Sequence, residues 1–136
     1  MGKENKFNIP DTKLPATNLK FSFEFYDTSC NKYCLSRWPE ENIAMALKRL
    51  KEICEKTFQE LQRDRVTYRL HEIDWSQCRE EGFPKGRINE IPNFQFSLLG
   101  INQQKARVFG GYADNTFFIV WFDLNHEIWP SFMKHT

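Results

Sequence analysis

The chain has 136 residues, enough for one domain with a sizeable hydrophobic core and too few for two ordinary domains. Its 19 Lys and Arg side chains nearly balance its 18 Asp and Glu side chains, so the net charge neither indicates nor excludes nucleic acid as a partner. No run of about 18 apolar residues is present, so no membrane span is expected. The polar first residues lack the apolar core of a secretion signal, and we therefore expect a cytoplasmic protein with reduced thiols.

A polar arm precedes the first predicted strand. Residues 1–18 contain few large apolar side chains and are expected to form a flexible arm, which leaves residues 19–136 for a single α+β domain. In the stretch Leu19–Asp27, three phenylalanines alternate with more polar neighbours. They are Phe21, Phe23 and Phe25. A period of two of this kind predicts a half-buried strand.

Two helices are predicted next, at about residues 39–55 and 57–64. Pro39 suits the first turn of a helix, and apolar residues recur after it at three- and four-residue spacing. This apolar stripe comprises Ile43, Ala44, Leu47, Leu50, Ile53 and Cys54. Thr57 and Glu60 have the spacing of a capping box, which predicts that a second helix begins there.

The segment that follows the helices is less regular. Residues 65–74 predict a short strand, because Val66, Tyr68 and Leu70 alternate with polar residues. Residues 75–93 contain two glycines and two prolines and predict a long loop. Loops of this length in compact domains are uncommon and often functional.

Three strands are predicted at the end of the chain, at residues 94–99, 105–112 and 116–123. The last is almost wholly aromatic and β-branched, which predicts the most buried, central strand. With the first strand and the helices, this meander predicts an α+β fold, in which two helices pack on an antiparallel sheet of about four strands.

A tight turn at Asp114-Asn115 sets the predicted register of the last hairpin. If Ala113 faces Thr116, Arg107 lies opposite Phe122. Side-chain alternation then places the following residues on one face: Gln103, Lys105, Arg107, Phe118, Phe122 and His126. The opposite face would carry Val108, Tyr112, Phe117, Ile119 and Trp121.

The closing segment also carries a family resemblance. It reads Ala106-Arg107-Val108-Phe109, then Asp114-Asn115, then an apolar strand, then His126. This pattern and the predicted element order resemble the RelE/ParE/HigB-like bacterial toxins, in which a helical pair packs on one side of a twisted sheet. Many members of that superfamily are ribosome-dependent mRNA endonucleases, while the ParE-like branch targets DNA gyrase. The resemblance implies a toxin-like endoribonuclease of a toxin–antitoxin system that cleaves mRNA, with RNA or the ribosome and an antitoxin protein as partners.

The resemblance also implies roles for two residues. Arg107 matches the superfamily's sheet arginine and would stabilise charge at the scissile phosphate, because a guanidinium donates two hydrogen bonds to phosphate oxygens. His126 matches the histidine near the chain end and would act as general acid or base, because imidazole titrates near neutral pH. Further cations, independent of the resemblance, are predicted to bind substrate phosphates: Lys85, Arg87 and Lys105. Glu90 is a further candidate base, and no cofactor or metal ion is expected.

These residues also have simpler interpretations. Arg107 would be solvated or paired with a glutamate, and His126 would belong to a surface turn. The chain would then be a non-catalytic protein-binding module, such as an inhibitor or immunity-type protein, that uses the sheet face and residues 75–93. A metal-dependent hydrolase built on His71 and Asp74 is a third class, although the sequence holds no recognised metal motif.

Overall fold

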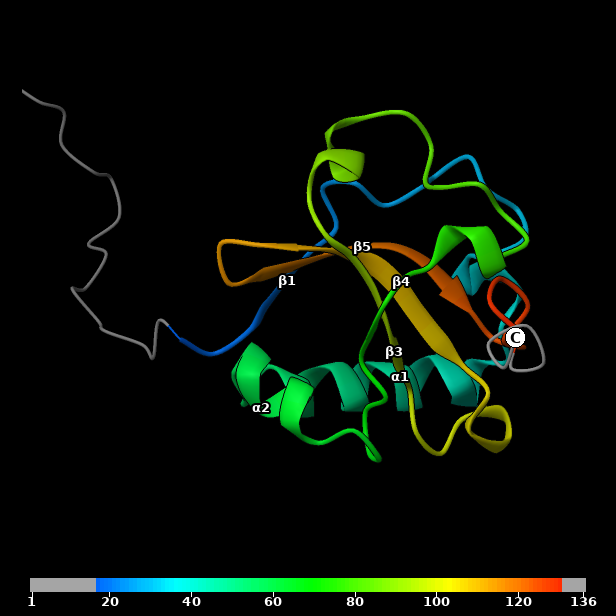
Figure 1. Ribbon diagram of the computed structural model, residues 1–136. Coiled ribbons are helices and arrows are strands. Elements are labelled where there is room, and N and C mark those ends of the chain that lie inside the picture. Colours follow the sequence, from blue (N-terminus) through cyan, green and yellow to red (C-terminus); the bar gives the residue numbers. More distant parts are fainter. Residues whose placement is uncertain (1–16, 131–136) are drawn as a thin grey trace, which may run out of the picture.

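The computed structural model describes residues 17–130 and has an α+β architecture (Figure 1). Its strands form one mixed sheet in the order β1-β5-β4-β3-β2. The strands are β1 (Lys20–Ser22), β2 (His71–Glu72), β3 (Asn93–Ser97), β4 (Arg107–Ala113) and β5 (Thr116–Asp123), and the helices are α1 (Glu40–Ile53) and α2 (Phe58–Arg63). Most of the predicted N-terminal arm, residues 1–16, lies outside the described residues.

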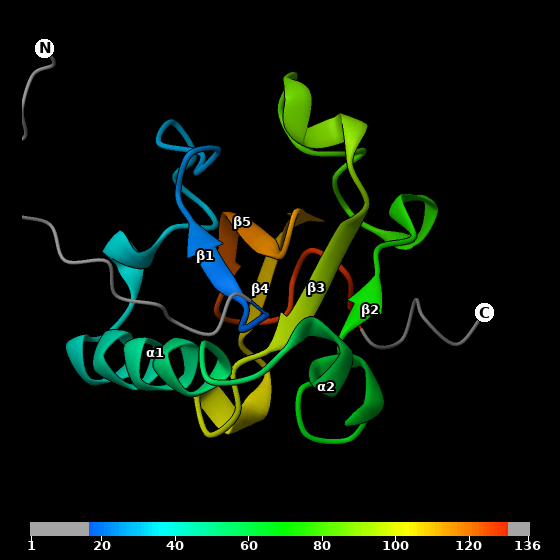
Figure 2. The same ribbon diagram turned by 90° about the vertical axis from the view of Figure 1, so that its left-hand side faces the viewer.

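The sheet has five strands rather than about four, because the short strand predicted within residues 65–74 joins it as β2, and one pair of its strands is parallel. After β1 the chain passes through both helices to the far edge of the sheet, where β2 begins (Figure 2). It then returns through three antiparallel steps to β5, which runs parallel to β1. The predicted α+β class is therefore confirmed, and the prediction of an antiparallel sheet is wrong for its first strand.

Two predicted strands are much shorter in the structure. β1 ends at Ser22 because the chain turns there, with the Tyr26 N–H donating to the Phe23 carbonyl at 3.0 Å, and Phe23 is 55% exposed. The strand predicted over residues 65–74 is reduced to β2. Its first half is a turn in which the Asp64 carboxylate accepts the Thr67 N–H at 2.9 Å, and Val66 is exposed rather than buried.

The two helices and the capping box between them are confirmed. The Thr57 hydroxyl accepts the Glu60 N–H at 3.1 Å, and the Glu60 carboxylate accepts the Thr57 N–H at 2.8 Å. The buried stripe of α1, however, consists of Ala46, Leu50 and Ile53. The prediction was wrong for Ala44 and Leu47, which are both exposed, Leu47 by 58%. One residue along a helix is a rotation of about 100°, so Leu47 turns away from the sheet when Ala46 faces it.

Each face of the sheet is covered by its own hydrophobic core. Both helices lie on one face, and the loop of residues 75–93 lies on the other (Figure 1). The loop-side core contains Tyr33, Phe83, Ile88, Phe109, Val120, Trp121, Ile128 and Trp129. Gly111 makes room for this loop, because a Cβ there would lie 2.8 Å from Ile91 and 2.9 Å from Ile88. The loop therefore packs directly on this second face of the sheet.

The β4–β5 hairpin follows the predicted register only near its turn. Asp114 and Asn115 both have positive φ, as a two-residue hairpin turn requires, and Ala113 pairs with Thr116. A β-bulge between Phe109 and Gly110 then shifts the register by one residue.

The bulge changes which side chains share a face with Arg107. Arg107 pairs with Asp123 rather than with Phe122. Phe122 packs in the helix-side core and Trp121 in the loop-side core, which is the reverse of the prediction. The physical reason is the extra residue in β5, which reverses the alternation beyond it.

Two further expectations concern disulfide bonds and membrane-spanning helices. No disulfide joins any of the four cysteines, all of which lie within the described range. Among residues 17–130, no helix combines the length and the apolar character needed to cross a bilayer.

Candidate functional site

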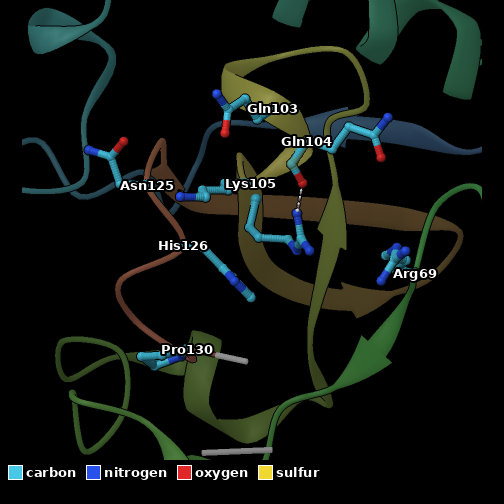
Figure 3. Close-up of a pocket in the computed structure, with 8 residues that line it drawn as sticks. Arg69, Gln103, Gln104, Lys105, Asn125, His126 and Pro130 are labelled. Carbon is cyan, nitrogen blue, oxygen red and sulfur yellow. Dashed lines mark hydrogen bonds between the residues drawn. The ribbon is translucent and has the colours of Figure 1, made fainter. Parts of the chain in front are cut away.

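An open pocket of about 370 Å³ lies at the end of the sheet where β4 begins (Figure 3). Four separate segments supply its walls: the turn before β2, the loop between β3 and β4, the start of β4, and the segment after β5. The lining residues are Arg69, Gln103, Gln104, Lys105, Arg107, Asn125, His126 and Pro130. Three are permanent cations, and none of these lining residues is acidic.

Arg107 is held firmly at the base of this pocket. Its side chain is only 5% exposed. One terminal nitrogen, Nη1, donates to the Gln104 carbonyl at 2.7 Å, to the Ala106 carbonyl at 3.1 Å and to the Ser97 hydroxyl at 3.3 Å; Figure 3 marks the first with a dashed line. The buried Nε has no hydrogen-bond partner among the described residues. The guanidinium is thus fixed in place by Nη1, and its Nε–H donor is not used by any described residue.

The pocket concentrates positive charge. The pKa of Arg107 is lowered to about 10, chiefly by burial and then by the positive charge of Arg69, while the Asp123 carboxylate acts in the opposite direction. Arg107 therefore remains protonated at neutral pH, and Lys105 adds a third cation at the rim. Cations gathered in a hollow without a carboxylate on its wall attract anions, so the arrangement favours a negatively charged ligand.

The backbone around the pocket is strained. Seven non-glycine residues in the described range have positive φ, and two of these form the β4–β5 turn. The other five lie in or beside the pocket: Arg69, Asn102, Gln103, Gln104 and His126. Each such residue costs on the order of 1–2 kcal/mol, and contacts elsewhere in the structure must offset that cost. Strain of this kind gathers at functional sites in many proteins, which marks this end of the sheet as the candidate site.

Side-chain hydrogen bonds lock two of the strained loops together. The Asn102 amide donates to the Leu124 carbonyl at 3.1 Å and to the Asn125 side-chain oxygen at 2.6 Å. The β3–β4 loop is thereby tied to the segment that carries His126. Figure 3 shows Lys105 and His126 on one side of the hollow and Arg69 on the other.

The structure brings together some predicted site residues and separates others. Lys105, Arg107 and His126 line the same pocket. Lys85 lines a different hollow with Phe25, and Arg87 lines a third with Glu90. That third hollow also includes Ala113 and Asp114 at the hairpin end of β4, about 20 Å along the strand from Arg107 at roughly 3.3 Å per residue. Any contact of Arg87 with substrate is therefore remote from Arg107, and Lys85 lies outside the Arg107 pocket.

Sequence reasoning missed several lining residues. Arg69, Gln104 and Asn125 reach the pocket from loops whose conformations are left-handed or fixed by long-range contacts. Nothing in the local sequence around these three residues distinguishes them from ordinary loop residues.

His71 and Asp74 have structural contacts instead of a metal-site arrangement. The His71 ring lies edge-on to Trp129, with centroids 6.4 Å apart. The Asp74 carboxylate accepts the Ser76 N–H at 3.1 Å and the Ser76 hydroxyl at 2.6 Å. Within residues 17–130, no three His, Cys, Asp or Glu side chains are grouped so that they would hold a metal ion.

Fold and site together define a class: an α+β domain whose helix-backed mixed sheet ends in a strained, cationic pocket. No protein-family model, curated protein or solved structure matches the chain. The geometry of the pocket is therefore the basis for assigning a function.

Proposed function

We propose that this protein is a metal-independent, toxin-like endoribonuclease that holds the scissile phosphate of RNA in the pocket at Arg107. The observation that carries the proposal is the convergence of Lys105, Arg107 and His126 in one hollow whose lining contains no acidic residue. RNA supplies the ligand that such a hollow favours, because every linkage of its backbone carries a negative charge.

The element order supports the same proposal. A strand, two helices and then an antiparallel meander follow one another in the chain, and both helices lie on one face of the sheet (Figure 1). This is the order on which the resemblance to RelE/ParE/HigB-like toxins is based. An antitoxin protein, and the ribosome as the site of cleavage, belong to the proposal on the same basis.

The proposed reaction uses the 2′-hydroxyl of the RNA as nucleophile. Its oxygen forms a bond to the adjacent phosphorus as the bond from phosphorus to the 5′-oxygen breaks, which leaves a 2′,3′-cyclic phosphate and a 5′-hydroxyl. Arg107 would donate from its fixed guanidinium to a non-bridging oxygen as negative charge develops there. His126 would take the proton of the attacking hydroxyl while water protonates the leaving oxygen, or it would protonate the leaving oxygen while water takes the hydroxyl proton.

The proposal is tested with purified protein on a single-stranded RNA in the presence of a chelator and, in a second reaction, on mRNA bound to ribosomes. We expect cleavage to products with 2′,3′-cyclic phosphate ends, and we expect Arg107→Ala with His126→Ala to abolish it. Arg37→Ala is the matched control, because it removes an exposed cation outside the pocket. In cells, overproduction of the wild type should stop growth and the double variant should not. Harmless overproduction with intact cellular RNA would refute the proposal and favour a non-catalytic protein-binding module.

A further inference from the structure

Asp123 is the last residue of β5, and its carboxylate closes the turn that follows. The side chain is 1% exposed. One carboxylate oxygen accepts the Glu127 N–H at 3.0 Å and the other accepts the Ile128 N–H at 2.8 Å. Both hydrogen bonds join the end of the strand to the residues just after His126, which itself has a φ of 58°. The carboxylate thus fixes the turn that carries His126.

The bulge in the β4–β5 hairpin also places Asp123 beside Arg107. Without the register shift, Asp123 would not pair with Arg107 across the two strands. Burial raises the pKa of Asp123, and the N–H groups of Glu127 and Ile128 and the charge of Arg107 lower it in part. A buried carboxylate is costly unless such groups compensate it, and here two backbone N–H groups and the charge of Arg107 do so.

We infer that Asp123 is a positioning residue of the pocket, which holds His126 at the bound phosphate and limits the positive charge around Arg107. The inference rests on the proposed function of the pocket. Asp123 does not line the hollow, so it acts through the backbone of the turn and through its charge and makes no contact with the substrate.

The two effects of Asp123 have opposite consequences for catalysis and binding. Loss of the carboxylate releases the turn, and a general acid or base displaced by about 1 Å slows the reaction roughly 100-fold. The same loss leaves the pocket more positive, which strengthens its attraction for a phosphate anion. A residue with a merely structural role would weaken catalysis and binding together.

Asp123→Asn tests the inference, because asparagine keeps the side-chain shape but loses the charge and one of the two acceptor oxygens. We expect kcat to fall about 100-fold, whereas the Kd for a short 2′-O-methyl oligoribonucleotide, which lacks the nucleophile, stays equal or falls. Asp114→Asn is the matched control, since it makes the same charge change at the exposed hairpin turn. An unchanged kcat, or a loss of affinity as large as the loss of kcat, would overturn the inference.

Amide hydrogen exchange on the wild type provides a test that does not depend on a variant. The Glu127 and Ile128 amides should exchange slowly, because the Asp123 carboxylate accepts both. Exchange at the rate of an unstructured peptide would refute the positioning role even if the variant does not fold. If the wild type leaves RNA intact, the proposed function fails, while amide exchange and oligonucleotide affinity still decide the role of Asp123.

Discussion

Replacing Gly110 with alanine should destabilise the sheet far more than the same change at Gly111. Both glycines are buried and adjacent on β4. A Cβ at Gly110 would lie 2.0 Å from the Phe118 carbonyl oxygen, where real Cβ atoms essentially never come closer than 3.0 Å. The clash is with backbone, so two central strands must separate by about 1 Å at the bulge, at a cost near the upper end of the roughly 1–3 kcal/mol range for overpacking.

Gly111 is the matched control because its contacts are with side chains. A Cβ there meets the ends of Ile91 and Ile88 at 2.8 and 2.9 Å, and these methyl groups yield by rotation. Alanine also restricts the unfolded chain, which offsets about 0.4–1 kcal/mol. We therefore expect a change within about 1 kcal/mol for Gly111→Ala and a loss of about 3 kcal/mol for Gly110→Ala, equivalent to roughly 6–12 °C in Tm.

Urea unfolding followed by tryptophan fluorescence measures this difference, since Trp121 is buried in the loop-side core. Comparison at equal m values gives the difference in the free energy of unfolding. Equal midpoints for the two variants would refute the reasoning, because they would mean that the strands do not approach so closely at Gly110.

Four further outcomes are expected. Leu50→Ala should cost about 2–5 kcal/mol and Leu47→Ala less than about 0.5 kcal/mol in chemical denaturation, because Leu50 is 7% and Leu47 58% exposed; equal losses would contradict the assigned helix face. Thr57→Ala should lower stability by about 1 kcal/mol through loss of the capping box, measured by thermal unfolding. Burial raises the pKa of Asp123 above its ordinary value of 3.8. Protonation of Asp123 therefore stabilises the folded state; this stabilisation is complete below pH 3.8 and is lost as the pH rises through the folded-state pKa. On acidification the wild type should gain stability relative to Asp123→Asn, and parallel profiles of stability against pH would contradict this. If three cations contact phosphates, a plot of log binding constant against log salt concentration should have a slope of about −2 for single-stranded RNA, and a flat plot would exclude backbone contacts.

The parts of the fold that depend on local sequence were predictable. The unbroken apolar run of β5 and the Asp114-Asn115 turn fix a hairpin almost by themselves, and Thr57 with Glu60 fixes the start of α2. The bulge was not predictable, because it depends on a close approach at Gly110 that only the folded sheet creates. It displaced the register by one residue and so changed the partner of Arg107 from Phe122 to Asp123.

The site was predictable only where its residues lie on the hairpin. Pairing of β4 with β5 brings the start of β4 beside the end of β5. The same end of the sheet therefore receives Lys105, Arg107 and His126. Arg69 arrives there through a different pairing, that of His71 with Gln95 at the sheet edge. The Gln95 amide donates to the Arg69 carbonyl at 3.2 Å and holds the turn in place. Contacts between such distant segments leave no periodic signal in the sequence.

The parallel pairing of β1 with β5 has a consequence for the order in which a growing chain folds. Roughly 100 residues separate these partners, so at about 5–20 residues per second β1 is made roughly 5–20 s before β5. The Leu19 N–H meanwhile has an earlier acceptor, the Lys56 carbonyl at 2.8 Å, and Asn18 forms an isolated β-bridge with Thr57. We expect β1 to dock on the helical pair first and to be in place as a template when the last strand leaves the ribosome.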